Sequence, residues 1–370
     1  MDDKPNLELD VAVLGAGGTI APAIVRDLAV SDEVKRMLLL DVDADRAMAV
    51  AQAHGAGRAV SRRVDARDAA QLVAALDGVD VVVNSASYRL NLEVMQACLA
   101  ARCHYLDLGG LYWMTQRQLE LGPEFERAGL LAVLGIGSSP GKTNLMALRG
   151  VRELDGAPVE SVEVAAAGRD REARADGRLR PPYALQTLLD ELRMEPVVLR
   201  DGRAEHTAPL ADGGVVDYGP PIGEAPTILT LHSELATFGE SFGCRSASFR
   251  LSLAPALLEQ LHALVEAPGE EVARAAQLVE PQSNSTVSVH VVSVEARDGR
   301  RVRVRSVTEP HFGLGGSIIS TATPAAATVR LLARGSVSAT GVLPPERCIE
   351  PGEMFAELAE RGCTITVESG

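Results

Sequence analysis

Gly15 and Gly17, near the beginning of the chain, have the spacing of the first two glycines of a dinucleotide-binding motif. The stretch GAGGTI, residues 15–20, gives the pattern G-x-G-x-x-I, with Ile20 where a third glycine is usual. Gly15 permits a tight turn, and Gly17 lets backbone N–H groups approach a pyrophosphate at the start of a helix. We therefore expect a nicotinamide dinucleotide to be bound by Gly15, Gly17, Gly18, Thr19 and Ile20.

Acidic residues follow the next strand-like runs. Asp41 ends the run RMLLLDV, where it can hydrogen-bond the adenosine ribose hydroxyls and repel a 2′-phosphate. No Arg follows it directly, so the pattern favours NAD as the cofactor, without excluding NADP. The alternative for Asp41 is a helix cap or a solvated loop acid. Asp43 and Asp68 are predicted helix caps, and Asp65 is a candidate neighbour of the cofactor.

Small residues follow the fourth strand-like run. The stretch NSASYRLN, residues 84–91, lies where the nicotinamide end of a dinucleotide passes in a parallel sheet. Ser85 and Ala86 leave room for the backbone to approach a ligand. Both are therefore predicted to contact the cofactor.

The stretch GIGSSPGKT, residues 135–143, is similar to a triphosphate-binding loop. That loop has the pattern G-x-x-x-x-G-K-[ST], which requires glycine where this chain has Ile136. Pro140 also removes one backbone N–H that could hold phosphate. We interpret the stretch instead as the loop from the sixth strand into a helix. Lys142 then either meets a substrate carboxylate at the sheet edge or lies on a solvated helix start.

The elements that position these residues alternate between strand and helix. Short Val- and Leu-rich runs ending in Gly or Asp are typical of buried parallel strands, and amphipathic stretches lie between them. Six such runs predict an α/β fold with a doubly wound parallel Rossmann sheet. They are residues 10–17, 36–42, the run AVSRRV, residues 80–86, the run CHYLDLGG and residues 130–137.

The second half of the chain has a different pattern. Residues 195–206 and 285–307 each carry Asp-Gly between strand-like runs, a strong hairpin signal, and residues 246–254 form another strand-like run. The pattern predicts an inserted α+β domain with an antiparallel sheet. Residues 171–182 are a predicted mobile loop, and the Ala-rich helix 323–335 is predicted to return to the nucleotide domain. The predicted domains are residues 1–150, 151–318 and 319–370.

Composition and charge argue against a nucleic-acid-binding, membrane-spanning or secreted protein. The 370 residues carry a net charge of -14, which favours a small-molecule substrate and gives no support for nucleic-acid binding. No apolar run reaches the ~20 residues of a membrane span, and the acidic start MDDKPNLELD is unlike a secretion signal. The five cysteines never occur in C-x-x-C spacing, which predicts reduced thiols, a cytoplasmic location and no metal site. Exposed hairpin edges would suit a homodimer.

Five stretches spread over nearly the whole chain form a more specific pattern together than alone. They are VAVLGAGGTIA, DVVVNSASYRLNLEVMQACLAARCHYLDLGG, GIGSSPGKTNLMA, LHSELATF and GVLPPERCIEPGEMFAELAERG. This pattern resembles the saccharopine dehydrogenase family, which includes saccharopine reductase, lysine 6-dehydrogenase and carboxynorspermidine dehydrogenase. Two departures bear on the substrate more than on the fold. Ser139 stands where many relatives carry an acid, and Ile20 replaces a small residue.

The resemblance implies hydride transfer at an amino-acid C–N bond through an imine. Such chemistry needs a general base to take the amine proton. Asp107, after the fifth strand, is the first candidate, and its alternative role is to cap the turn at Gly109. His232 in LHSELATF is the second and Lys142 the third, although a lone His is often structural. Candidate substrate-binding residues are Arg89, Tyr105, Glu234 and His311, with Glu309 as a further acid.

Three functions remain open from the sequence. The first is an NAD-dependent dehydrogenase of a lysine-like amino acid, similar to lysine 6-dehydrogenase. The second is an NADPH-dependent reductase that condenses an amine with a carbonyl, of the saccharopine or carboxynorspermidine type. The third is a non-catalytic NAD(H)-binding sensor, because a fold does not determine a function.

Overall fold

The computed structural model describes residues 7–174 and 176–369, and these form two compact units. The first unit holds the described residues up to Leu145 together with Thr321–Leu358, and the second holds Met146–Ser320 and the segment from Ala359 onward. Helices α7 and α12 carry the chain from one unit to the other. The first six residues of the predicted non-secretory start, and residue 175 of the predicted mobile loop, lie outside the described residues.

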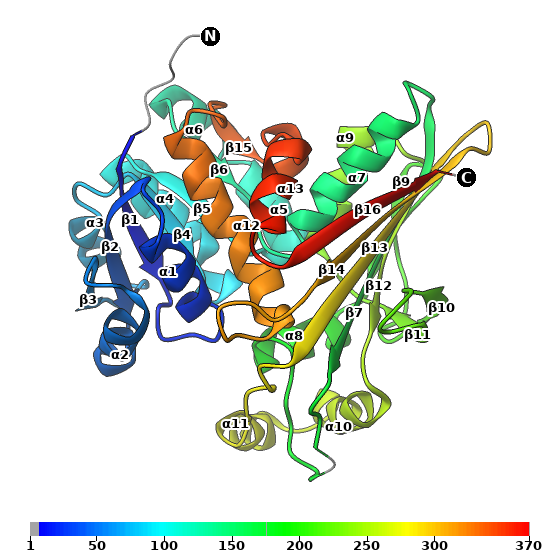
Figure 1. Ribbon diagram of the computed structural model, residues 1–370, viewed down its shortest axis with the longest axis horizontal. Coiled ribbons are helices and arrows are strands. Elements are labelled where there is room, and N and C mark those ends of the chain that lie inside the picture. Colours follow the sequence, from blue (N-terminus) through cyan, green and yellow to red (C-terminus); the bar gives the residue numbers. More distant parts are fainter. Residues whose placement is uncertain (1–6, 175, 370) are drawn as a thin grey trace. The chain divides into compact units, whose positions relative to one another are not determined.

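The first unit is built on a parallel sheet with the order β15-β6-β5-β4-β1-β2-β3 (Figure 1). The prediction of a doubly wound α/β fold is confirmed. All six predicted strands form, and each ends within a few residues of its predicted end. The strands are β1 (Leu9–Leu14), β2 (Val34–Asp41), β3 (Ala59–Arg63), β4 (Val81–Asn84), β5 (His104–Asp107), β6 (Leu131–Val133) and β15 (Gly341–Leu343).

Helices follow each of the first six strands. Their buried faces cover apolar strands such as Val81–Asn84, whose four residues are all buried. The parallel order brings the carboxyl ends of β1, β2, β4, β5 and β6 to one edge of the sheet, where ligands of such folds bind. The helices are α1 (Ala21–Ala29), α2 (Ala44–His54), α3 (Ala69–Ala75), α4 (Asn91–Ala101), α5 (Leu111–Leu119), α6 (Gly122–Ala128) and α7 (Lys142–Glu153), with the short η1 (Tyr88–Leu90) before α4.

The C-terminal part of the chain is shared between the units. α12 (Gly316–Ala333), β15, η3 (Pro345–Arg347) and α13 (Pro351–Ala359) return to the first unit, and β15 pairs with β6. The last strand, β16 (Cys363–Ser369), instead pairs with β14 (Arg301–Thr308) in the second unit. Residues 319–370 therefore do not all return to the nucleotide domain. β14 is an amphipathic strand that offers its free edge to β16.

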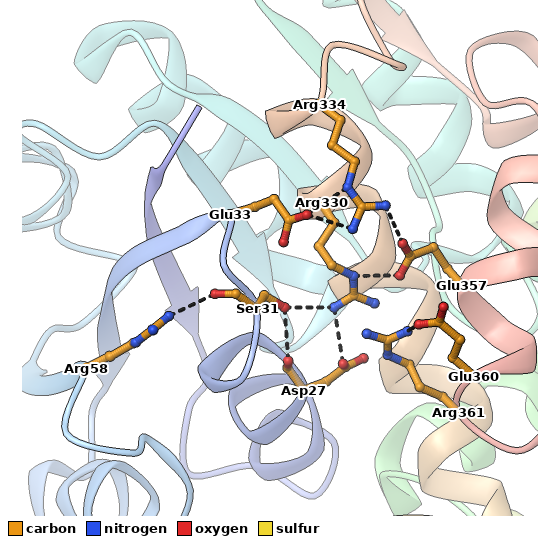
Figure 2. A network of polar contacts seen from close by, with 9 residues as sticks. All are labelled: Asp27, Ser31, Glu33, Arg58, Arg330, Arg334, Glu357, Glu360 and Arg361. Atoms are coloured by element: carbon orange, nitrogen blue, oxygen red, sulfur yellow. Dashed lines mark hydrogen bonds and ion pairs between the residues drawn. The ribbon is translucent and has the colours of Figure 1, made fainter. Parts of the chain in front are cut away.

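A buried ion-pair network holds the returning helix to α1 (Figure 2). The Arg330 guanidinium of α12 lies 3.1 Å from the Asp27 carboxylate of α1 and 2.6 Å from the Glu357 carboxylate of α13. Arg334, one turn later, contacts Glu33 and Glu357, each at 2.6 Å. Arg330 is only 2% exposed. Because buried charges persist only when they are paired, this network fixes the return segment against the first unit.

The second unit contains a nine-stranded sheet in which β10-β11-β12-β7-β13-β14-β16 follow one another, with β8 pairing with β12 and β9. The sheet is mixed, whereas the sequence pattern predicts an antiparallel one, because β12 and β7 run parallel. The long connection between these two strands permits that direction. The strands are β7 (Val159–Asp170), β8 (Val197–Arg200), β9 (Arg203–His206), β10 (Asp212–Asp217), β11 (Glu224–Leu229), β12 (Ser246–Ser252), β13 (Thr286–Ala296) and β14.

Both predicted hairpins form. β8 and β9 join through Asp201 (φ 48°) and Gly202 (φ 76°), a turn that requires left-handed backbone at both positions. β13 and β14 pair in continuous register from Ser288 with Thr308 to Glu295 with Arg301. The helices of this unit are α8 (Leu185–Arg193), η2 (Ser233–Ala236), α9 (Phe238–Phe242), α10 (Pro255–Val265) and α11 (Gly269–Gln277). Throughout the described residues, helices long and apolar enough to cross a membrane are absent.

Candidate functional site

The glycine-rich turn connects β1 to α1 at the carboxyl edge of the first sheet. Gly15 has φ 76°, and a Cβ there would come within 2.7 Å of the Ala86 backbone, so a larger residue does not fit. The Gly17 N–H donates to Asp41 Oδ2 at 2.8 Å. The start of α1 at Ile20 has no side-chain cap. An uncapped helix start beside a glycine turn fits the pyrophosphate of a dinucleotide.

Asp41 and its neighbours have distinct roles. The Asp41 carboxylate also accepts from the Asp43 N–H at 2.9 Å, so it holds both the glycine turn and the start of the next loop. Each of its oxygens still has a lone pair for a ribose hydroxyl. The predicted caps are confirmed, since Asp43 caps α2 and Asp68 caps α3. Asp65 closes a local turn by accepting from the Arg67 N–H at 3.0 Å.

The loop after β4 lies against the glycine turn. Ser85 Oγ donates to the Leu14 carbonyl at 2.8 Å, and Ala86 lies beside Gly15 as described above. The structure therefore brings the candidate cofactor residues Ser85 and Ala86 together with the turn. Arg89 is exposed, and its guanidinium lies 4.8 Å from the centre of the Tyr88 ring.

The backbone N–H groups of the loop after β6 donate hydrogen bonds within the protein. Gly137 N–H donates to the Pro140 carbonyl, Lys142 N–H to the Gly137 carbonyl and Thr143 N–H to the Ser138 carbonyl. The Gly135 and Ile136 N–H groups both donate to Asp107. A triphosphate-binding loop needs such groups to point at the phosphates. These N–H groups bond within the protein, so residues 135–143 do not have the structure of a triphosphate-binding loop, as the sequence predicts.

Asp107 is the centre of a buried polar network. Its Oδ1 accepts from the Gly135 N–H at 2.6 Å and the Gly109 N–H at 2.9 Å. Its Oδ2 accepts from Gln118 Nε2 at 2.7 Å, Tyr105 OH at 3.0 Å and Asn91 Nδ2 at 3.1 Å. One carboxylate thus joins the segments that follow β4, β5 and β6, and its contact with Gly109 is the turn cap weighed as its alternative role.

The electrostatics of Asp107 follow from this burial. Burial raises its pKa, while the hydrogen bonds from Gln118, Gly135, Tyr105 and Gly109 act in the opposite direction. Tyr105 is fully buried, and burial together with the Asp107 charge raises the pKa of its hydroxyl well above the usual value. The polar atoms of Asp107 and Tyr105 are both buried away from solvent. Both have the contacts of residues that fix a loop geometry.

Lys142 and the Pro-Gly-x-x-Asn stretch begin α7. Lys142 is completely buried at the end of the β6 loop, so the reading as a solvated helix start is wrong. Asn144 Oδ1 accepts from the Gly141 N–H at 2.9 Å, and Asn144 Nδ2 donates to Glu346 Oε2 at 2.8 Å. The PPE stretch of the C-terminal part is thereby anchored to this loop, and both belong to the first unit.

The second unit holds a separate buried acid–base cluster. His232, the residue before η2, is hydrogen-bonded through Nδ1 to Oε2 of Glu234, which lies in η2. The imidazole stacks on the Phe249 ring of β12, with ring centres 3.5 Å apart and planes 10° from parallel. His232 and Glu234 are 6% and 1% exposed. The two predicted residues of LHSELATF are therefore brought together in one place.

Two residues that the sequence reasoning missed complete this cluster. Tyr183 OH donates to Glu191 Oε2, and Glu191 is a buried residue of α8. Burial raises the pKa of Glu191 to about 7, with His232 and the Tyr183 hydrogen bond acting against it. Burial alone lowers the pKa of His232, but the charge of Glu234, its hydrogen bond and the charge of Glu191 outweigh burial, so this pKa is raised.

The remaining candidates of the second unit lie in a tight turn. His311 exchanges backbone hydrogen bonds with Leu314, and its ring lies 4.2 Å from that of Phe312. Glu309 forms a two-point ion pair with the Arg171 guanidinium at 2.7 and 2.9 Å, on the exposed surface. Across residues 7–174 and 176–369, the structure has no group of three His, Cys, Asp or Glu side chains suited to a metal ion.

Known proteins are similar to this chain both over its first unit and over nearly its whole length. A family model for the saccharopine dehydrogenase NADP-binding domain matches residues 11–133. A carboxyaminopropylagmatine dehydrogenase from Synechocystis sp. is 23% identical over 95% of this chain and 96% of its own length. Residues 11–133 thus match the NADP-binding domain of the saccharopine dehydrogenase family, and a relative of similar length is similar to the chain from end to end. These matches support an oxidoreductase whose first unit binds a nicotinamide cofactor.

Other relatives cover the chain to different extents. A carboxynorspermidine synthase from Vibrio alginolyticus is 30% identical over 25% of this chain and 26% of its own length. Apo saccharopine dehydrogenase (L-Glu forming) from Saccharomyces cerevisiae is 17% identical, with TM-score 0.73 over 98% of this chain and 100% of that one. Homospermidine synthase from Legionella pneumophila, in complex with NAD, is 10% identical, with TM-score 0.72 over 98% and 91%. The two solved structures show the fold.

Proposed function

We propose that this protein transfers a hydride between a nicotinamide cofactor and the C–N bond of an amino-acid-derived amine, through an imine. The observation that carries the proposal is the buried His232–Glu234 pair in the second unit. The uncapped start of α1 beside the glycine turn, together with Asp41, supports the dinucleotide part. When bound, the cofactor supplies or accepts the hydride.

His232 is the proposed general base. An amine gives up a hydride readily only after it has lost its proton, so a neutral imidazole must take that proton. Glu234, bonded to Nδ1, fixes the ring orientation and stabilises the imidazolium that forms. Burial lowers the pKa of His232, but the charge and hydrogen bond of Glu234 and the charge of Glu191 raise it overall, so the ring holds an accepted proton more firmly than a free imidazole does. Asp107 is proposed as a positioning residue, and Lys142 remains a proposed anchor for a substrate carboxylate.

Two forms of this reaction differ in the amine. In the dehydrogenase form, a primary amine of a lysine-like amino acid is oxidised. In the condensing form, an amine and a carbonyl compound are joined and the imine is reduced to a secondary amine. The relatives named carboxyaminopropylagmatine dehydrogenase and carboxynorspermidine synthase support the condensing form, since both names describe secondary amines. We therefore place that form first.

The absorbance of the reduced nicotinamide ring distinguishes these forms. Purified protein with NAD or NADP is offered lysine and related diamino acids, and separately NADH or NADPH with amine and carbonyl partners. Oxidation of the reduced cofactor only when both partners are present would support the condensing form. Turnover of a primary amino acid alone would establish the dehydrogenase form. Cofactor binding with no turnover in any mixture would leave a non-catalytic sensor.

Replacement of the proposed base gives the first quantitative prediction. We expect His232→Gln to lower kcat/KM about a hundredfold, because the amine proton loses its acceptor, while the Kd of the cofactor is unchanged. Steady-state rates and a cofactor-fluorescence titration measure the two effects. The control is His262→Gln, an exposed histidine of α10 in the same unit. Equal rates for the two variants would remove His232 from the proposed mechanism.

Cofactor choice depends on Asp41. We expect Asp41→Asn to shift the ratio of the NAD and NADP dissociation constants toward NADP by about tenfold, because a like charge beside the 2′-phosphate is removed while one amide oxygen can still accept from Gly17. The matched control is Asp43→Asn, which removes a neighbouring charge at a helix cap. If Asp41→Asn weakens both cofactors equally, Asp41 serves only to hold the turn.

Assembly and location complete the proposal. Strands β10 and β16 end the path of the second sheet, and their free edges support a homodimer formed by sheet extension. Light scattering of the purified protein measures the oligomeric state. The five cysteines are all free thiols in the structure, which supports a reducing cytoplasmic location.

A further inference from the structure

We propose that Glu191 and Tyr183 are positioning residues that set the charge state of His232, so that the four side chains work as one proton-holding cluster. The inference deepens the proposed function and rests on His232 being its base. Neither the sequence motifs nor the comparisons assign a role to α8, the helix that carries Glu191. The role follows from where α8 places an acid.

The position of Glu191 in α8 is unusual for a glutamate. The helix buries Leu185, Leu188, Leu189 and Leu192, which recur at the spacing of one helical face. Glu191 is only 5% exposed, although a glutamate is rarely buried without a partner. Its partner is the Tyr183 hydroxyl, which comes from the segment just before the helix. The buried carboxylate is therefore held in one orientation.

The cluster contains more acid than base. Glu191 and Glu234 are two buried carboxylates; His232 is hydrogen-bonded to Glu234, and its charge acts on Glu191. Phe249 covers one face of that imidazole and offers no charge. Asp190, the next residue of α8, acts on Glu191, but it is not among the groups that shift His232. Burial disfavours the imidazolium form of His232, and Glu234 and Glu191 are the two charges that favour it.

This arrangement gives Glu191 a defined effect on the reaction. When the amine proton moves to His232, the new imidazolium is hydrogen-bonded to Glu234 and interacts electrostatically with Glu191, so its positive charge is compensated in a buried environment. Burial raises the pKa of Glu191 to about 7, so this carboxyl group gains or loses its own proton near neutral pH. Ionised Glu191 then favours the imidazolium, while protonated Glu191 does not. The two groups titrate as a coupled pair.

The test measures His232 directly in the cofactor-bound full-length protein. The ring Cε1–H resonances of the seven histidines are followed by NMR from acid to alkaline pH, and His232→Gln assigns the relevant signal. We expect Glu191→Gln to lower the pKa of His232 by about one unit, because one stabilising negative charge is lost. Glu191→Asp should retain most of the native value. Asp190→Asn, an adjacent buried acid, should leave it unchanged.

Tyr183→Phe is a second variant that keeps Glu191 in place. It should raise the Glu191 pKa by removing a hydrogen bond to the ionised form, and thereby make the His232 titration broader. A His232 pKa that is the same in Glu191→Gln as in the native protein would overturn the proposal. So would an equal shift in Asp190→Asn, because the effect would then come from general disturbance of α8.

The pH profile of kcat/KM links the cluster to turnover. In the amine-oxidising direction His232 must be neutral to act, so kcat/KM measured in that direction rises as pH increases through the pKa of His232, and Glu191→Gln should move this rise to lower pH by the same amount as the NMR shift. A lower rate with an unmoved profile would indicate a merely structural role and overturn the proposal. If no substrate is turned over, the proposed function fails while the NMR titration still decides the role of Glu191.

Discussion

An Arg330→Met variant is expected to lose about 3–5 kcal/mol of unfolding free energy in the first unit. The substitution keeps the aliphatic stem but leaves Asp27 and Glu357 as buried carboxylates without the guanidinium between them. Removing one partner of a buried pair costs more than the pair contributes, and here Asp27 loses the guanidinium that compensates its charge, while Glu357 keeps its contact with Arg334. The network would open where α12, α1 and α13 meet (Figure 2).

Urea unfolding followed by tryptophan fluorescence measures this loss. The chain has one tryptophan, Trp113 in α5, so the signal reports the same unit that contains Arg330. The control is Arg36→Met, which removes an ion pair with Asp10 whose arginine is 61% exposed. We expect that pair to contribute less than about 1 kcal/mol. A comparable loss in the two variants would show that the buried network adds little.

The network also bears on the cofactor-binding half of the molecule. α1 begins at the glycine turn, and Asp27 lies in its last turn, so the ion pairs with Arg330 fix the far end of the helix that receives a pyrophosphate. The last third of the chain thereby supports a site built from the first. A sequence cannot indicate that pairing, because Asp27 and Arg330 each have the pattern of an ordinary surface charge on an amphipathic helix.

Local patterns predicted the first sheet well for a physical reason. Parallel strands are buried on both faces, so they appear as short apolar runs, and each ends where a polar or glycine residue meets the sheet edge. β15 was missed because its three residues, Gly341–Leu343, carry no such run. It forms only because β6 offers an unpaired parallel edge. A strand this short forms because a neighbouring strand pairs with it, and not because its own residues favour β-structure.

Strand direction was the part of the second sheet that the sequence did not reveal. Asp-Gly turns determine antiparallel neighbours directly, which is why both hairpins were found. The β12–β7 pair joins strands separated by a long connection, and alternation along a strand is the same whichever way its neighbour runs. Likewise, Glu191 and Gln118 occur in helices beside other polar residues. Their burial depends on tertiary packing, so no local signal separates them from solvated residues.

Asp107 illustrates the same limit at the site itself. An acid at the end of a parallel strand beside the expected nicotinamide is a reasonable candidate base on sequence grounds. The structure instead surrounds its carboxylate with five donors, three from side chains and two from the backbone. A base must present a lone pair to its substrate, whereas this group already accepts from three separate segments. Loss of activity on its replacement would therefore not identify it as the base.

Asp107→Asn is accordingly expected to cost about 3 kcal/mol of stability in the first unit, because the amide NH₂ replaces an acceptor and faces other donors. The raised pKa of Asp107 means that folding favours its protonated form. In the native protein, the contribution of Asp107 to the free energy of unfolding therefore falls as the pH rises from the pKa of the unfolded chain to the higher pKa of the folded one. Above the folded pKa this contribution is constant. This pH-dependent contribution should be missing in the variant. Urea unfolding at several pH values, read by Trp113 fluorescence, measures both effects.

The decisive comparison combines this stability with the pH profile of kcat/KM. Asp80→Asn is the matched control, since Asp80 precedes β4 at the opposite end of the sheet and accepts one backbone N–H, that of Asp10. If Asp107 positions the loops after β4, β5 and β6, its Asn variant loses stability and rate, but the rise in activity assigned to His232 keeps its pH. A native-like stability with that rise abolished would instead restore Asp107 as the base. The two roles therefore predict opposite combinations of unfolding and kinetic results.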